Sequence, residues 1–241
     1  DNNIITFQNL ELDSLVKSPT LVGDWSPSAI SALSHFDNLM LHFSDAHDYN
    51  FGVKDEGTLP INLMVDWDIS TNGRNAMNLG NILVFGAKPG LNYADSFEVV
   101  GHELGHGIIS ELAGLRGIGW PSALNESFAD LFAVMASKQT DWIVGNDSEN
   151  TAVRSMSNPK MFSELRPMYY WEFVNKNNMQ HDNAGIPNYY FYLIAEGLAE
   201  GELGVSIGRE KLEKLAFLTL STLSASSDFS ITHNSMRQIA I

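Results

Sequence analysis

Residues 102–106 read His-Glu-Leu-Gly-His, and this stretch decides how the rest of the sequence is interpreted. On a helix, positions four apart stack on one face, so the imidazoles of His102 and His106 point at one spot with Glu103 beside them. Two imidazole nitrogens can bind Zn²⁺ while the free carboxylate takes a proton from water. A helix surface can also carry this spacing without a metal, so the motif alone leaves both interpretations open.

A third ligand is required, and residues 125–130 (NESFAD) offer one. Glu126 and Asp130 are also four apart, and two antiparallel helices joined by a loop can bring that face against the histidines. Glu126 would complete a His₂Glu zinc set that leaves the fourth position to water. Asp130 could accept the Nδ1–H of His102, and Asn125 is a second polar neighbour of the ligands. The alternative, an acidic solvated helix face, fails to explain why these residues sit among phenylalanines and leucines.

Hydrophobic periodicity predicts the elements around this motif. Asp95, with Glu98 three residues later, is the predicted N-cap of the helix that carries the histidines, and Gly114 is its predicted end. Ser26 and Pro27 are the predicted start of an earlier helix. We further expect strands at 61–67, 75–77 and 82–85, and helices at 122–137, from 187 onward, at 208–224 and at 229–241. Strands precede most helices, which indicates an α+β fold with two segregated lobes.

Composition excludes several classes of protein. The chain has 241 residues, which favours one domain or two closely packed lobes. It has no cysteine, so thiolate metal sites and cysteine catalysis are excluded. Its 14 basic and 29 acidic residues give a net charge of −15, and a surface of this sign repels phosphate backbones, so nucleic acid is not an expected partner. No apolar run approaches the roughly 20 residues that a membrane-spanning helix needs.

The pattern HELGH followed by NESFAD, with 19 residues between His106 and Glu126, resembles the thermolysin-like zinc metallopeptidases, a gluzincin family of secreted bacterial endopeptidases. Segments 74–77 (RNAM), 153–159 (VRSMSNP) and 181–188 (HDNAGIPN) resemble further motifs of that family in the expected order. The resemblance implies a two-lobed zincin with its zinc cleft between the lobes. Residues 1–115 would form a small β-rich lobe with the substrate edge strand and the HExxH helix. Residues 116–241 would form a mainly α-helical lobe.

The resemblance also implies roles for individual residues. One catalytic Zn²⁺ would be held by His102, His106 and Glu126, and Glu103 would act as general base. His181 would donate a hydrogen bond to the oxyanion of the tetrahedral intermediate, a contribution whose loss typically costs roughly 10²–10³ in rate.

Three more residues are expected to bind substrate. Arg154 would contact a substrate carbonyl, and Asn75 and Ala76 would add the peptide as an extra strand. The implied activity is hydrolysis of peptide or protein substrates before apolar residues, by a secreted, extracellular protein. The chain stops short of the family's usual length, so we expect a compact or truncated variant, or one domain of a larger secreted protein such as a toxin or virulence factor.

The sequence departs from the family in three ways that bear on function. The acidic residue that the family keeps a few positions before the second catalytic histidine has no counterpart here, since residues 175–180 are neutral or basic, so we expect His181 to be less well oriented. Gly117 stands where the family places an oxyanion-assisting tyrosine, so we expect reduced catalysis unless Trp120 or a nearby group substitutes. The alternative function is therefore a catalytically impaired pseudoprotease that binds peptides. Of the family's calcium ligands, Glu98, Asp141 and Asp147 remain, and we expect Ca²⁺ binding to be weak or lost. The remaining histidines receive no role in this interpretation: His35, His42, His47 and His233.

Overall fold

Strands dominate the first part of the chain and helices the second, which confirms the predicted α+β fold. The structure, a computed structural model, describes residues 4–7, 25–54, 57–58, 61–68, 76–148, 151–198 and 205–241. The strands are β1 (Ile4–Phe7), β2 (Val53–Lys54), β3 (Gly57–Thr58), β4 (Ile61–Asp68), β5 (Ala76–Asn78), β6 (Ile82–Lys88), β7 (Leu91–Asn92), β8 (Ile143–Val144) and β9 (Arg154–Ser155). The α-helices are α1 (Pro27–His47), α2 (Phe97–Leu112), α3 (Trp120–Ser137), α4 (Gln180–Asn183), α5 (Gly185–Glu196), α6 (Arg209–Leu220) and α7 (Phe229–Ile239).

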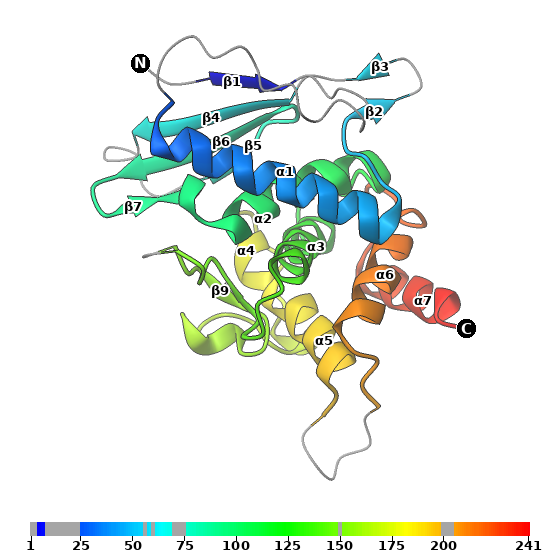
Figure 1. Ribbon diagram of the computed structural model, residues 1–241. Helices are drawn as coiled ribbons and strands as arrows, with labels where there is room; N and C mark the ends of the chain where they lie inside the picture. Colours follow the sequence, from blue (N-terminus) through cyan, green and yellow to red (C-terminus); the bar gives the residue numbers. More distant parts are fainter. Residues whose placement is uncertain are drawn as a thin grey trace.

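The main sheet has the strand order β1-β4-β6-β5, and β7 also pairs with β6. Strands β4 and β6 are parallel, whereas β1, β5 and β7 pair antiparallel to their neighbours. On β4 the side chains of Ile61, Leu63 and Val65 are buried and alternate with less buried ones, as the period-two pattern predicts. The sheet forms the upper part of the molecule, with α1 and α2 packed below it (Figure 1). Strand β5 ends the order and is therefore an edge strand.

Both α1 and α2 begin at a serine cap. The Ser26 hydroxyl accepts a hydrogen bond from the Ala29 amide at 3.2 Å, with Pro27 next, as predicted. For α2 the predicted cap at Asp95 is wrong. Asp95 ends a 3₁₀ turn (Tyr93–Asp95), and the extended backbone of Ser96 lets its hydroxyl accept from the Val99 amide at 3.1 Å. Ser96 is the N-cap because it immediately precedes the first helical residue, Phe97.

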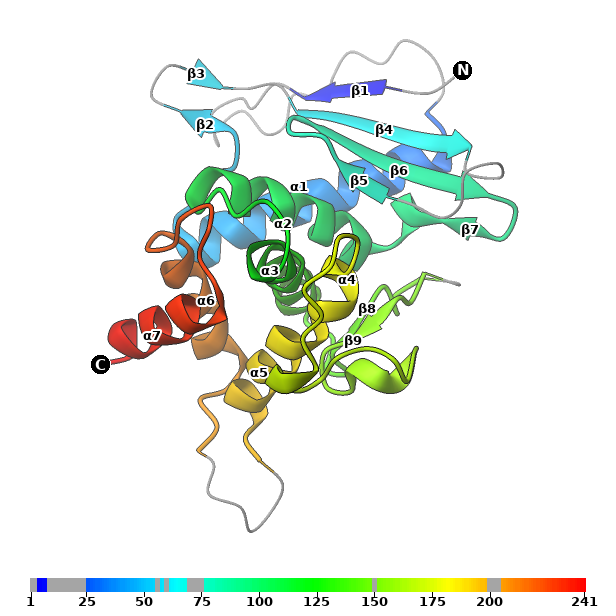
Figure 2. The same ribbon diagram turned by 180° about the vertical axis from the view of Figure 1, so that it is seen from behind.

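Helix α3 crosses α2 in close contact and lies in the middle of the molecule (Figures 1 and 2). It begins at Trp120, two residues before the predicted start, because Pro121 lies at the first turn, where no N–H is needed. Thirteen of its 18 residues are buried, so α3 is covered by other elements on nearly every side. Gly114, with a φ of +62°, follows the end of α2, as predicted.

The C-terminal helices α5, α6 and α7 pack around α3. Helix α5 begins at Gly185 rather than Pro187, which lies inside its first turn. A Cβ at Gly185 would lie 2.3 Å from the Pro167 carbonyl oxygen, so only glycine fits this approach. Helices α6 and α7 are shorter than predicted because each ends in a turn, at Leu220 and at Ile239.

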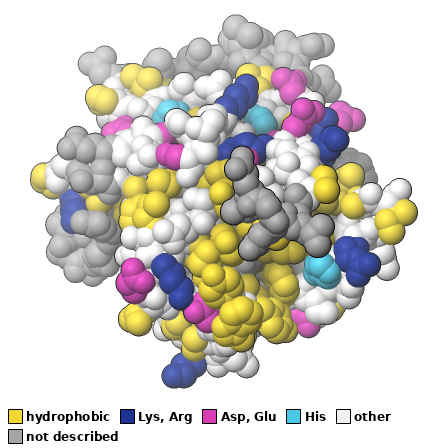
Figure 3. All heavy atoms as spheres, turned by 90° about the horizontal axis from the view of Figure 1, so that it is seen from below, with side chains coloured by type: hydrophobic (Ala, Val, Ile, Leu, Met, Phe, Trp, Pro, Cys, Tyr) yellow, Lys and Arg dark blue, Asp and Glu magenta, His cyan; other side chains and the backbone are white. Residues whose placement is uncertain are grey.

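The surface seen from below carries a broad group of hydrophobic side chains (Figure 3). Large apolar side chains are also exposed along residues 161–171, including Leu165 at 90% and Trp171 at 79%. Among the described residues, no helix combines the length and the apolar composition needed to cross a membrane.

Candidate metal centre

Helices α2 and α3 bring His102, His106 and Glu126 together. One ligand atom from each of these residues lies within 4.8 Å of the others. The Nε2 atom of His102 is 3.4 Å from Oε2 of Glu126, and Nε2 of His106 is 3.9 Å from Oε1. The close crossing of the helices makes this possible, since Gly105 of α2 faces Ala129 of α3 without side chains between them. Two imidazole nitrogens and one carboxylate therefore converge on one point.

The donor atoms at this point fit a zinc ion. Glu126 is 8% exposed, and its Oε2 atom is buried without a hydrogen-bond partner among the described residues. Burial alone would raise the pKa of Glu126, but interactions with His102 and His106 hold it at about 2, so the carboxylate is charged. A buried, ionised oxygen that lacks a hydrogen bond and lies beside imidazole nitrogens is the environment expected of a metal ligand. Two nitrogens and one oxygen are the protein donors of many catalytic zinc sites.

Hydrogen bonds to the far nitrogens orient both rings. Nδ1–H of His102 donates to Oδ1 of Asp130 at 2.8 Å. Nδ1–H of His106 donates to Oδ1 of Asn125 at 2.5 Å, while the Asn125 amide nitrogen donates to the Leu115 carbonyl at 2.8 Å and so fixes which atom faces the ring. With Nδ1 protonated in each ring, Nε2 is the nitrogen that faces Glu126, and it can bind a metal ion once it carries no proton. Asp130 and Asn125 thus lie where the sequence predicted them.

Asp130 is itself held by a network that the sequence did not predict in full. Arg154 donates to it through Nε at 2.8 Å and Nη2 at 2.7 Å. Asn188 donates to Oδ2 of Asp130 at 2.9 Å and accepts from Ser127 at 2.6 Å. Burial opposes ionisation of Asp130, which is fully buried, yet the Arg154 charge keeps its pKa far below the usual range. The signal that could have identified Asn188 is an amide within the otherwise apolar start of α5.

Glu103 lies beside the ligands and is 5% exposed. Burial raises its pKa to about 7, partly offset by the charge of His102. Its backbone carbonyl accepts a hydrogen bond of 2.6 Å from the side-chain Nδ2 of Asn78 on β5. Asn78, another residue that sequence reasoning missed, thereby ties the edge strand to the helix that carries Glu103. Ala76 is on this strand, opposite Phe85, whereas Asn75 lies outside the described residues.

On the far side of the ligands stands His181, from α4. Its Nε2 atom is 3.4 Å from Oε2 of Glu126, and its side chain is 53% exposed. Partial burial lowers the pKa of His181, although the charge of Glu126 acts in the opposite direction. A cavity of about 480 Å³ opens onto Glu126 and is lined in part by Gly117 and Gln180. Another, of about 570 Å³, runs from Asn78 past His106. Open space therefore flanks the ligands on two sides.

Gly117 has no side chain to donate a hydrogen bond to the cleft, and the ring of Trp120 is packed between other aromatic side chains. A Cβ at Gly117 would meet nothing within 4 Å, and its φ is +110°. The Trp120 ring stacks on Phe173 with 3.9 Å between ring centroids and on Tyr170 with 5.3 Å. The stack fixes the position of the Trp120 ring but leaves the indole N–H on its edge, so the replacement of the missing tyrosine by Trp120 stays a prediction.

Backbone and side-chain donors surround the three acids expected to remain from the calcium site. Glu98 accepts from the Gly145 and Asn146 amides, at 2.7 and 3.1 Å. Asp147 accepts from the Phe97 amide at 2.6 Å at the start of α2, and Asp141 accepts from the side chain of Asn146 at 2.7 Å. These hydrogen bonds do not offset burial and the charge of Asp147, which together raise the pKa of Glu98 to about 7. Weak or lost calcium binding stays a prediction.

The amino-acid sequence is similar to those of known metallopeptidases. The model of the thermolysin metallopeptidase catalytic domain matches residues 12–110, and that of the alpha-helical domain matches residues 113–241. The chain is 31% identical over 180 residues to an extracellular elastase of Staphylococcus epidermidis, covering 70% of this chain and 34% of the elastase. It is 27% identical over 240 residues to a gelatinase of Enterococcus faecalis, covering 92% and 44%. The chain thus spans about a third to under a half of these curated relatives.

The fold is also shared with a solved structure. The precursor of protealysin, a metalloproteinase from Serratia proteamaculans, superposes with a TM-score of 0.71 and 23% identity, covering 92% of this chain and 74% of that one. This likeness shows the same fold. Together with the matched family models, which include more than half of the chain, it confirms the resemblance seen in the sequence: the chain belongs to the thermolysin metallopeptidase family.

Proposed function

We propose that the chain is a zinc-dependent endopeptidase that hydrolyses peptide bonds by attack of water, with Glu103 as the general base. The observation that carries this proposal is the convergence of His102, His106 and an oxygen of Glu126 that lacks a hydrogen bond, next to a buried carboxylate. Matched family models and relatives named for proteolysis support the same activity. Cleavage before apolar residues is the preference that we expect from the family resemblance.

His102, His106 and Glu126 would hold the ion. When bound, Zn²⁺ supplies Lewis-acid chemistry, lowering the pKa of water toward 7 and polarising the scissile carbonyl. Glu103 accepts the proton of the attacking water and passes it to the departing amine. Its position next to His102 on α2 keeps the base beside the reaction without consuming it as a ligand.

Substrate would lie along the edge strand. Ala76 on β5 would bind an added peptide strand, and Asn75, which lies outside the described residues, is expected from the family resemblance to do the same. The hydrogen bond from Asn78 to the Glu103 carbonyl ties β5 to the helix that carries the base. The two bonds of Arg154 to Asp130 use Nε and Nη2, so Nη1 is the donor left for a substrate carbonyl. His181 Nε2, which faces the ligands, would donate to the developing oxyanion.

The second candidate is a peptide-binding pseudoprotease or toxin domain. One observation favours it, namely the open, exposed Gly117 in place of a hydrogen-bond donor. For either function we propose secretion, peptide or protein partners, and an association with further domains or segments, since the curated relatives are longer and one is described as extracellular.

Hydrolysis of a quenched fluorescent peptide tests the proposal. Glu103→Gln should reduce turnover by roughly 10²–10⁴ while zinc content stays unchanged, because a general base contributes about that much. Glu111→Gln is the matched control, since it makes the same substitution at an exposed position of the same helix. Wild-type turnover in Glu103→Gln would refute the mechanism. Zinc-loaded wild-type protein that cleaves no unfolded substrate would instead support the pseudoprotease.

A further inference from the structure

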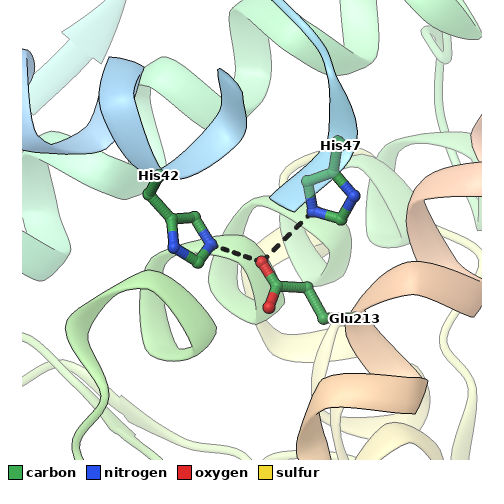
Figure 4. Close-up of side chains that lie close together, drawn as sticks. All are labelled: His42, His47 and Glu213. Atoms are coloured by element: carbon green, nitrogen blue, oxygen red, sulfur yellow. Dashed lines mark hydrogen bonds and ion pairs between the residues drawn. The ribbon is translucent and has the colours of Figure 1, made fainter. Parts of the chain in front are cut away.

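A second group of metal-ligating side chains lies between α1 and α6, apart from the candidate centre on α2 and α3. His42 and His47 come from the end of α1, and Glu213 comes from α6, 166 or more residues later (Figure 4). Nε2 of His42 is 2.5 Å from Oε1 of Glu213, and Nε2 of His47 is 3.3 Å from the same oxygen. One ligand atom from each residue lies within 4.8 Å of the others.

The spacing of these atoms is close to that of a tetrahedral metal site. Zinc bonds of about 2.0–2.1 Å put neighbouring ligand atoms about 3.3 Å apart. The contact between His47 and Glu213 already has this value. The contact between His42 and Glu213 would have to widen by about 0.8 Å to match it. His42 can make this movement because its side chain is 16% exposed, whereas His47 is 3% exposed.

Packing holds two of the three groups in place. The His47 ring stacks on Phe217 of α6 with 4.1 Å between centroids and 10° between planes. Glu213 is 7% exposed, and both histidine rings approach its Oε1 atom. The site thus presents a buried carboxylate and a fixed imidazole, with a movable imidazole to close on an ion.

An ion can reach the group from solvent. A cavity of about 680 Å³ opens onto His42 and Glu213. Its wall carries three more acids, Asp45, Asp147 and Glu210, against two lysines, Lys138 and Lys214. This excess of negative charge favours a cation, and the cavity leaves room for water as a further ligand.

We propose that His42, His47 and Glu213 form a second site for a transition-metal ion, with Zn²⁺ as its occupant. Two imidazoles and one carboxylate suit zinc and exclude calcium or magnesium, which need mostly oxygen donors. The ion joins the end of α1, which packs under the sheet, to a helix of the C-terminal half, so its role is structural. Without a metal, both imidazoles would simply donate Nε2–H to Oε1 of Glu213, and that arrangement is the alternative outcome.

The test is the zinc content of the full chain after equilibration at about 1 µM free Zn²⁺. At this concentration, surface sites with millimolar dissociation constants stay almost empty. The wild type should hold two equivalents, and His42→Gln and Glu213→Gln one fewer each. His35→Gln, the same substitution elsewhere on α1, should match the wild type. Equal zinc in His42→Gln, Glu213→Gln and the wild type would overturn the proposal. The proposal concerns only the difference in zinc content between the wild type and these variants. If the α2–α3 centre binds no zinc, the wild-type total falls to one equivalent, but that difference remains.

Stability supplies a readout that does not depend on turnover. With free zinc about 100-fold above the dissociation constant, the second ion should raise the unfolding midpoint by roughly 5–10 °C. That part of the zinc-dependent rise should be missing in His42→Gln and present in His35→Gln, while peptide hydrolysis stays at the wild-type rate in both. If the Glu213 or His42 variants fail to fold, anomalous scattering at the zinc edge from wild-type crystals decides. No peak between the three side chains would refute the site.

Discussion

Replacement of Gly105 by alanine should separate the two helices that assemble the metal centre. Gly105 lies between His102 and His106 on α2, and a Cβ there would be 2.9 Å from Ala129 Cα and 3.3 Å from Ala129 Cβ. Ordinary carbon contacts are about 3.5–4.0 Å, and neither Ala129 atom can rotate away. The helices must therefore part locally by about 0.6–1 Å, which moves both imidazoles away from Glu126.

Two opposing effects set the size of the change. Overpacking of this kind costs about 1–3 kcal/mol, while alanine gains about 0.8–1 kcal/mol over glycine in helix propensity. The net loss should be about 0–2 kcal/mol, which lowers the unfolding midpoint of the metal-free protein by up to roughly 8 °C. Ligand positions must hold within about 0.2 Å, so zinc affinity should fall by roughly 10–100-fold, as when supporting groups are lost.

Thermal unfolding and competition with a zinc chelator measure the two quantities. Gly101→Ala is the matched control, because its Cβ would lie 3.2 Å from Ala133 Cα and from the movable Leu39 Cδ2. This gap needs only a few tenths of an ångström, and helix propensity offsets it, so stability and zinc affinity should change little. If Gly105→Ala proves as stable as the wild type and binds zinc equally well, the close crossing does not set the ligand geometry.

Three more predictions follow from the same structure. Burial and the charge of Asp147 raise the pKa of Glu98 to about 7, above the unfolded value near 4.5, so ionised Glu98 destabilises the fold and wild-type stability should fall as pH rises through 7. Glu98→Gln should therefore raise the free energy of unfolding, measured by urea denaturation, by roughly 1–3 kcal/mol at pH 8 and leave it unchanged at pH 4. A calcium ion bound at Glu98 would reverse the effect and make the variant less stable. Asp130→Asn should weaken zinc binding by roughly 10–100-fold in chelator competition, because Oδ2, which accepts from Arg154 Nε and from Asn188, is replaced by an amide nitrogen that can only donate, so the group that orients His102 is no longer held. Chelation of the wild type should abolish peptide hydrolysis and lower the unfolding midpoint, and added Zn²⁺ should restore both.

Local patterns predicted the elements, and they failed where two local signals competed. The alternation of Ile61, Leu63 and Val65 predicts β4 because one face of that strand is buried. The N-terminus of α2 was misassigned because Asp95 and Ser96 are both good caps in sequence. The extended backbone at Ser96 decides between them, and it comes from the preceding 3₁₀ turn. Helix ends shifted by two residues where proline can occupy more than one position of the first turn.

Part of the metal centre could be predicted because two of its ligands lie close together in the sequence. The spacing of His102 and His106 places both on one helix face, whereas contacts between segments far apart in the sequence leave no pattern in it. The bond from Asn78 to the Glu103 carbonyl is one example. The group at His42 is another, since positions 42 and 47 are five apart and do not stack on one face of an ideal helix. Their convergence depends on Glu213, which only the packing of α6 brings to them.

Burial argues for catalysis over peptide binding alone. Asp130 and Asn188 are almost fully buried and serve to orient His102 and Arg154, and Glu103 is buried without being a ligand. Burial of polar and charged groups lowers the stability of the fold, and a groove that only binds peptides does not require them. Gly117 has a φ of +110°, which tyrosine would rarely adopt, so the loop itself differs and a simple Gly117→Tyr change should not restore a donor. Oxyanion stabilisation would then rest on His181, and the loss of one donor slows such an enzyme by roughly 10²–10³ without abolishing it.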